Sequence, residues 1–399
     1  MKKLFLIILS TIILSGCTAN HQQKEISFWT LQMGDFSKYI TEIISNYETS
    51  HPDIKIKWVD VPFSEGEKRT LAAVMTDNPP DLINLNPDFS AILAQKGTLL
   101  EIPKDKLGSF SPEVIDSLLY NNKIYSIPWY ATSAVTIYNK DLLNKAGINN
   151  IPKTYDELAN ISGTIKSRTG AYSFLPTITE NDTILKILNK YGISEPDMFN
   201  SKEALHVFDL FKTLYDKNLI PQETITMTHR EALEQYMAGK IVFYQGGANF
   251  LNMIKENAPG IYTVTDVAPQ IRGTIGQNDF SLMNFVIPIK AKYKDEALDF
   301  CLFLTNEENQ LNLAKMTNVI ATNQAALKNE FYNNYSDINS KARSLSAKQL
   351  EHLSPQLMQK KNQKEINLLA NKAIQSILLN KHATQEILDT LVIKLSQYY

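Results

Sequence analysis

The stretch EISFWTLQMGDFSKYITEIISNYETSHPDIKIKWV, residues 25–59, decides the fold. Residues 25–31 and 53–59 alternate apolar and polar side chains and are rich in β-branched and aromatic types, which predicts two strands. Between them, the apolar residues of 36–47 recur at helical spacing. Two strands joined by a single helix favour parallel pairing with a right-handed crossover. The stretch therefore predicts an α/β architecture.

The alternation of strand and helix continues along the chain. A helix is predicted over 64–75, and strands over 81–85, 124–128 and 134–138, with Pro128 ending the strand before it. Beyond Asn139 the pattern is mostly helical. The helices predicted there are 155–168, 183–190, 201–217, 230–238 and several from about 336 to 399, and the strands are 241–244, 261–265 and 284–289.

The N-terminus has the pattern of a secretory signal. Lys2 and Lys3 precede an apolar run that ends in small residues and Cys17, and the run is shorter than the roughly 20 residues that span a bilayer. Leu-Ser-Gly-Cys at 14–17 resembles the bacterial lipobox, whose cysteine receives a diacylglycerol. We expect residues 1–16 to be a signal peptide and 17–24 a lipidated N-terminus with a polar spacer. A buried cysteine in an ordinary signal peptide is the alternative.

Composition and motifs argue against several classes of protein. The net charge of −2, with both signs interspersed, gives no reason to expect a nucleic-acid partner. The six histidines are scattered, and no Gly-x-Ser-x-Gly, His-Glu-x-x-His or phosphate-loop motif occurs. We therefore expect no enzyme, no metal site and no cofactor. Cys301 lies in an apolar run and is predicted to be a core residue.

Several segments, in order, resemble the extracellular solute-binding proteins of carbohydrate ABC transporters, the group that includes the maltose-binding proteins. They are ISFW at 26–29, NPPDLI at 78–83, AQKGTLL at 94–100, YSIP at 125–128, IYNKDLL at 137–143, PKTYDEL at 152–158 and YMAGK at 236–240. The resemblance covers nearly the whole mature chain. It implies a two-lobed periplasmic-binding-protein fold, class II-like, in which each lobe is a mixed sheet flanked by helices and the ligand cleft lies between the lobes.

The resemblance also implies lobe boundaries and a task. The N-lobe would comprise 25–137 with about 285–325, and the C-lobe 138–284 with about 326–399, with crossovers near Tyr138–Asn139 and near Pro288. The protein would be a monomer, held outside the cytoplasmic membrane by the lipid on Cys17. There it would trap a sugar by hinge closure and deliver it to ABC permease subunits that use a separate ATPase.

Two departures from the maltose-binding pattern limit the expected substrate. Leu85 stands where those proteins have a tryptophan, and residues 366–369 supply no aromatic ring. A monosaccharide or short oligosaccharide is therefore favoured over a long chain. A polyol or glycerol phosphate stays an alternative, although the candidate loops hold no arginine cluster of the kind that phosphate usually needs. A sensor lipoprotein that presents a ligand to a receptor is a further alternative.

Sugar capture needs aromatic planes for the C–H faces of the ring and converging polar groups for its hydroxyls. Residues in loops after strands are the candidates, because ligands of α/β folds bind there. Trp29 could equally well be a core residue, and Asp88 could equally well cap a helix. The glycines would let backbone N–H groups approach the ligand, although a plain tight turn explains them as well. The predicted ligand contacts are Trp29, Gln32, Asn86, Asp88, Trp129, Tyr130, Gly246, Gly247, Asn249, Phe250 and Asn284.

Overall fold

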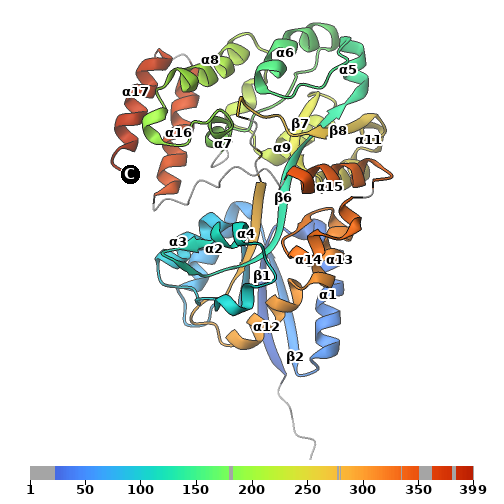
Figure 1. Ribbon diagram of the computed structural model, residues 1–399, viewed down its shortest axis with the longest axis vertical. Coiled ribbons are helices and arrows are strands. Elements are labelled where there is room, and N and C mark those ends of the chain that lie inside the picture. The colour runs from blue at the N-terminus through green and yellow to red at the C-terminus, as the bar shows by residue number, and fades with distance from the viewer. Residues whose placement is uncertain are drawn as a thin grey trace, which may run out of the picture.

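The computed structural model describes residues 23–178, 183–275, 278, 280–333, 335–349, 362–379 and 383–398 of the 399-residue chain. The predicted signal peptide and the lipid site at Cys17 lie outside the described residues. Figure 1 shows two bodies, one above the other, with the long strand β6 (Ile127–Asn139) running from one into the other. Within the described ranges, no helix is long and apolar enough to cross a membrane.

The first body, the lower one in Figure 1, is built on a mixed sheet. Strand β1 (Lys24–Leu31) pairs in parallel with β2 (Ile54–Val61) and β3 (Leu82–Leu85), as the strand–helix–strand pattern predicts. Strand β9 (Phe280–Val286) then lies antiparallel between β3 and the first half of β6, and β10 (Ile320–Ala321) closes that edge. The chain returns to this sheet after the second body has been formed.

Strand β6 corrects the prediction of two strands over 124–128 and 134–138. It is continuous, and Pro128 lies inside it as the second residue, a position near a strand end where proline is tolerated. Residues up to Ser133 pair with β9 and β10, whereas residues from Ala134 onwards pair with β7 (Phe243–Gly247) and β8 (Thr265–Pro269). One strand therefore belongs to the sheets of both bodies and connects them.

Helices cover the sheet of each body (Figure 1). Those of the first body are α1 (Ser37–Ser50), α2 (Phe63–Val74), α3 (Pro87–Gln95), α4 (Pro112–Asp116), α12 (Lys294–Leu304), α13 (Glu307–Thr317) and α14 (Gln324–Leu327), with a ribbon of β4 (Leu119–Tyr120) and β5 (Lys123–Ile124). Those of the second body are α5 (Lys140–Ala146), α6 (Tyr155–Thr169), α7 (Thr183–Lys190), α8 (Lys202–Asp216), α9 (His229–Met237), α10 (Phe250–Asn257), α11 (Pro259–Val264), α15 (Ile338–Gln349), α16 (Gln363–Leu378) and α17 (Thr384–Leu395). The strand predicted at 261–265 is wrong, because Pro259 begins the short helix α11 there.

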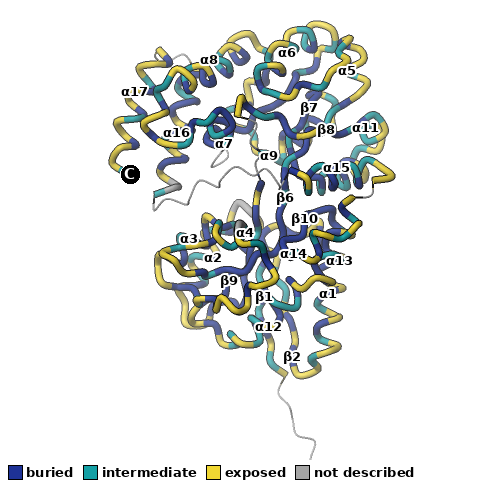
Figure 2. The backbone as a smooth tube through the Cα atoms, viewed as in Figure 1, coloured by how far each residue is buried: buried dark blue, intermediate teal, exposed yellow. Residues whose placement is uncertain are grey.

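Each body has its own apolar core, and the buried backbone in Figure 2 follows the strands and the inner helix faces. The first core contains Phe28, Phe285 and Phe300, and the second contains Phe208 and Phe211. Cys301 is fully buried in the first core, which confirms it as a core residue. The predicted lobe boundaries stay a prediction, and the partner change in β6 falls a few residues before the predicted boundary at 137/138.

Candidate functional site

Trp129 and Tyr130 lie in the core of the first body, which corrects their prediction as ligand-stacking rings. Trp129 is fully buried and stacks on Phe285 with 4.5 Å between ring centroids. Tyr130 is also buried, and its hydroxyl meets the sulfur of Met33 at 3.5 Å. The prediction assumed that neighbouring strand residues face opposite sides. The pairing register of β6 shifts between Pro128 and Tyr130, and this irregularity lets both rings enter one core.

Trp29 does not end its strand, because β1 continues to Leu31. Its ring is half-buried and packs with the apolar cluster that includes Leu85 and Phe89, on the sheet face opposite Phe28. The guanidinium of Arg69, from α2, lies 5.9 Å from the ring centroid, a cation–π distance. Packing therefore accounts for most of the Trp29 surface, and its role in ligand binding stays a prediction.

The polar candidates of the first body follow β1 and β3. Gln32 is exposed and has a left-handed backbone with φ of 50°, which is uncommon for a residue other than glycine. Asn86 caps α3, since its side-chain oxygen accepts a hydrogen bond from the Phe89 N–H at 2.8 Å. Asp88 is therefore not the cap; it is an exposed residue of the first turn of α3. The side chains of Gln32 and Asp88 are exposed and accessible to a ligand.

Asn284 is fully buried, which corrects its prediction as a ligand contact. Its side-chain oxygen accepts from the hydroxyl of Ser90 at 3.3 Å, and its backbone carbonyl accepts from the side chain of Asn84 at 3.2 Å. It thus ties β9 to β3 and to the first turn of α3. No surface of its side chain remains for a solute in this arrangement.

Packing explains why two glycines end β7, just before α10. A side chain at Gly246 would collide with the ring of Tyr244, and one at Gly247 would collide with the side chain of Asn249. Both glycines are the last two residues of β7 and pair with β6, so the tight-turn interpretation is wrong for them, and the turn lies at residues 248–249. Asn249 is half-buried and makes no side-chain cap for α10. Ligand contact by this turn stays a prediction.

Phe250, the first residue of α10, belongs to an aromatic cluster that the sequence did not indicate. Its half-buried ring lies 5.2 Å from the ring of His229 and 5.8 Å, edge-on, from that of Tyr244. The Tyr244 hydroxyl and His229 Nε2 are 2.6 Å apart and share a hydrogen bond. Burial, with nearby Lys186 and Arg230, lowers the pKa of His229 to about 4. The imidazole is therefore neutral near pH 7, and the cluster presents a partly exposed ring.

An ion pair beside this cluster joins the two bodies. Arg230 Nη2 lies 3.1 Å from a carboxylate oxygen of Asp35, which belongs to the short helix η1 (Gly34–Phe36) after β1. The start of α9 is fixed by a capping box between Thr228 and Glu231, so Arg230 projects from a defined helix end. Neither Asp35 nor Arg230 was predicted from the sequence as a site residue. The Thr-x-x-Glu pattern could have located the start of α9, but nothing in the sequence pairs Arg230 with a residue 195 positions away.

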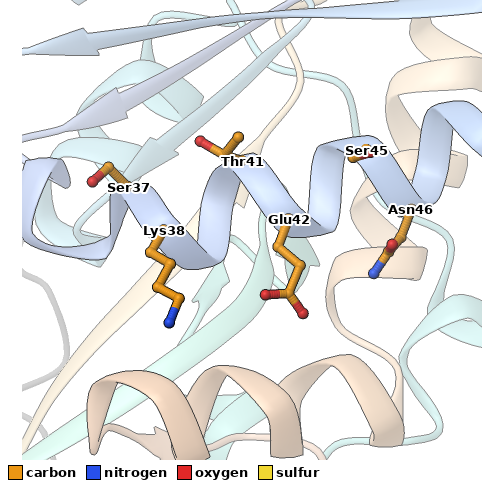
Figure 3. Close-up of a pocket in the computed structure, with 6 residues that line it drawn as sticks. All are labelled: Ser37, Lys38, Thr41, Glu42, Ser45 and Asn46. Carbon is orange, nitrogen blue, oxygen red and sulfur yellow. The ribbon is translucent and has the colours of Figure 1, made fainter.

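A separate hollow of about 520 Å³ lies along α1 and is lined by Ser37, Lys38, Thr41, Glu42, Ser45 and Asn46. Figure 3 shows these polar side chains projecting from successive turns of the helix. None of the predicted ligand contacts lines this hollow, so it is not part of the candidate site. In the part of the chain that the structure describes, no three His, Cys, Asp or Glu side chains are grouped as metal ligands would be.

The comparisons with known proteins agree with this architecture. Residues 42–339 match the family model described as bacterial extracellular solute-binding protein. The chain belongs to this family. The members of this extracellular solute-binding family are binding proteins that act outside the cytoplasm, and the sequence resemblance stated above is confirmed.

Three relatives illustrate the similarity of this solute-binding protein to others. A proposed oligosaccharide periplasmic-binding protein from Synechococcus sp. MITs9220, solved with zinc, superimposes with a TM-score of 0.85 at 28% identity over 94% of this chain and 98% of that one. Maltose-bound MalE3 of T. maritima has a TM-score of 0.80 at 21% identity over 94% and 100%, which confirms the two-lobed fold class. The diacetylchitobiose binding protein DasA of Streptomyces coelicolor is 22% identical over 333 residues, 77% of this chain and 75% of that protein.

Proposed function

We propose that this solute-binding protein captures a monosaccharide or short oligosaccharide between its two bodies and delivers it to an ABC permease. The observation that carries the proposal is the position of Phe250, a partly exposed ring beside an ion pair that joins the bodies. A pyranose has apolar C–H faces that stack on such a ring, and a rim of hydroxyls that needs donors and acceptors. The sugars named for DasA and for MalE3 support the same class of ligand.

The charges at the site favour a neutral ligand. Arg230 is paired with Asp35, so together they offer donors and acceptors without a net charge. A phosphate would need a cation that is not already neutralised in this way. Lys186 adds positive charge near His229, so glycerol phosphate stays an alternative ligand. A neutral polyol is the other alternative.

The remaining parts of the proposal concern where and with what the protein works. Residues 1–16 would be removed, and the lipid on Cys17 would hold the monomeric protein at the outer face of the cytoplasmic membrane. A permease with a separate ATPase would receive the sugar. The protein would carry out no catalysis and would bind no metal, cofactor or nucleic acid. It would bind its ligand through Gln32, Asp88, Trp29 and the 246–250 segment, which includes Phe250. A sensor that presents the sugar to a receptor is the second candidate.

Isothermal calorimetry against maltose, diacetylchitobiose, monosaccharides, polyols and glycerol phosphates tests the proposal. We expect a neutral sugar to bind, and Phe250→Ala to weaken that binding roughly tenfold to hundredfold by removing the stacking surface. Phe303→Ala is the matched control, because Phe303 is also half-buried but packs against Tyr47 in the first body. Binding of glycerol phosphate alone, or an equal loss in both variants, would contradict the proposal.

A further inference from the structure

Asn318 connects the first body to the turn that carries Phe250. It ends α13 in the left-handed conformation, with φ of 64°, and its side chain is 6% exposed. Its side-chain N–H groups donate to the backbone carbonyl of Ala248 at 3.2 Å and to that of Asn339 at 3.1 Å. Ala248 lies between β7 and α10, so this amide reaches from one body into the candidate ligand turn of the other.

The amide of Asn318 can lie in only one orientation. Arg343, in α15, donates from Nη1 to the Asn318 side-chain oxygen at 3.4 Å. The opposite orientation would place that oxygen against two carbonyls and the N–H groups against a guanidinium, which has no acceptor. Arg343 is itself fixed, because its guanidinium stacks 3.5 Å from the ring centroid of Phe331 and its Nε donates to the Phe331 carbonyl at 3.1 Å.

The carbonyl that Asn318 holds begins the first turn of α10. The same oxygen accepts from the Leu251 N–H at 3.2 Å, and Asn249 provides no side-chain cap for this helix. Asn318 thus fixes, from outside, a helix end that lacks its own side-chain cap. Phe250 lies two residues beyond Ala248, so the direction of its ring depends on how this turn is held.

We propose that Asn318 is a positioning residue that holds the first turn of α10 and so aims the Phe250 ring, with Arg343 orienting its amide. The consequence for sugar binding rests on the proposed function. The positioning itself does not depend on the proposed function, because both hydrogen bonds of Asn318 are present without a ligand. Loss of the two donated hydrogen bonds should raise the population of the opened turn roughly twofold to tenfold.

Hydrogen–deuterium exchange of the full chain without sugar tests this proposal. Asn318→Asp keeps the shape and the acceptor for Arg343 but removes both donors. Asn318→Gly removes the amide and suits the left-handed backbone. The matched control is Asn218→Gly, because Asn218 follows α8 in the same conformation, with φ of 53°, but is exposed, and its side-chain oxygen accepts from the Tyr172 hydroxyl within the same body.

We expect both Asn318 variants to exchange twofold to tenfold faster in peptides that cover residues 246–257, while peptides over α6 keep the wild-type rate. Asn218→Gly should leave 246–257 unchanged. No change at 246–257 in either Asn318 variant would overturn the proposal, as would an equal rise over α6 and α10, which would make Asn318 a residue of the general fold. Because no sugar is added, this result stands whether or not the calorimetry finds a sugar ligand.

Discussion

Replacing Trp129 with alanine should destabilise the protein because the indole is a fully buried part of the first core. The ring stacks on Phe285 at 4.5 Å between centroids and meets Tyr130 edge-on at 5.0 Å. Truncation of such a residue removes its burial and leaves a cavity, at a cost of roughly 3–5 kcal/mol in the free energy of unfolding. For a cooperative unit of about 150–250 residues, this lowers the melting temperature by roughly 6–20 °C.

Differential scanning calorimetry of the ligand-free protein measures this change, and Phe250→Ala provides the comparison. Phe250 is only half-buried, so its truncation should lower the melting temperature by a few degrees at most while it weakens sugar binding. Trp129→Ala should show the reverse pattern. At a temperature well below its own transition, it should still bind sugar with an affinity close to wild type, because its ring has no exposed surface.

Comparison of Trp129→Ala with Phe250→Ala tests the assignment of Trp129 to the core. If Trp129→Ala melts within a degree or two of wild type yet binds sugar much more weakly, the indole contacts the ligand and its assignment to the core is wrong. The register shift in β6 would then not bury both rings in solution, and the candidate site would have to be rebuilt around Trp129 and Tyr130.

Three further predictions concern single residues. Asn86→Ala should lower the free energy of unfolding by about 0.5–2 kcal/mol in urea titrations, because α3 loses its cap. His229, with its pKa lowered to about 4 chiefly by burial, binds fewer protons in the folded than in the unfolded chain between pH 4 and about 6.5. Stability should therefore fall as the pH drops through that range, by at most about 3 kcal/mol, and His229→Asn should flatten the curve measured by urea unfolding. Cys17→Ser should abolish lipidation and leave the precursor uncleaved, and mass spectrometry that finds unmodified Cys17 in wild-type membranes would contradict the lipid anchor.

The fold could be predicted from local patterns wherever burial follows a regular period. Parallel pairing of β1, β2 and β3 agrees with the alternation in residues 25–85. In the second body, α6, α7, α8 and α9 lie within one residue of their predicted ends. The continuity of β6 could not be predicted in this way. A proline such as Pro128 is typical of a strand end, and the register shift beside it interrupts the alternation from which the two faces of a strand are predicted.

The site was predicted less well because its residues come together from distant segments. Asp35 and Arg230 are 195 positions apart, and Asn318 and Ala248 are 70 positions apart. No local pattern reports such pairs. Trp129 and Tyr130 were mispredicted for a different reason: an aromatic ring near a strand end suits a core as well as a ligand, and only the observed burial separates the two.

The strength of the Asp35–Arg230 ion pair limits what this pair can contribute to closure without a ligand. The Asp35–Arg230 pair is 47% and 40% exposed, and such pairs contribute at most about 1 kcal/mol. A bias of that size changes the ratio of closed to open forms by no more than about fivefold, whereas near-complete switching needs about 5.5 kcal/mol. A solute that stacks on Phe250 and also contacts Gln32 or Asp88 would supply the difference only by touching both bodies at once. It follows that a variant that weakens contacts with one body, such as Phe250→Ala, should lower both sugar affinity and the extent of closure that small-angle scattering detects with sugar present. Full closure with the affinity reduced would show that Phe250 holds the sugar without contributing to closure.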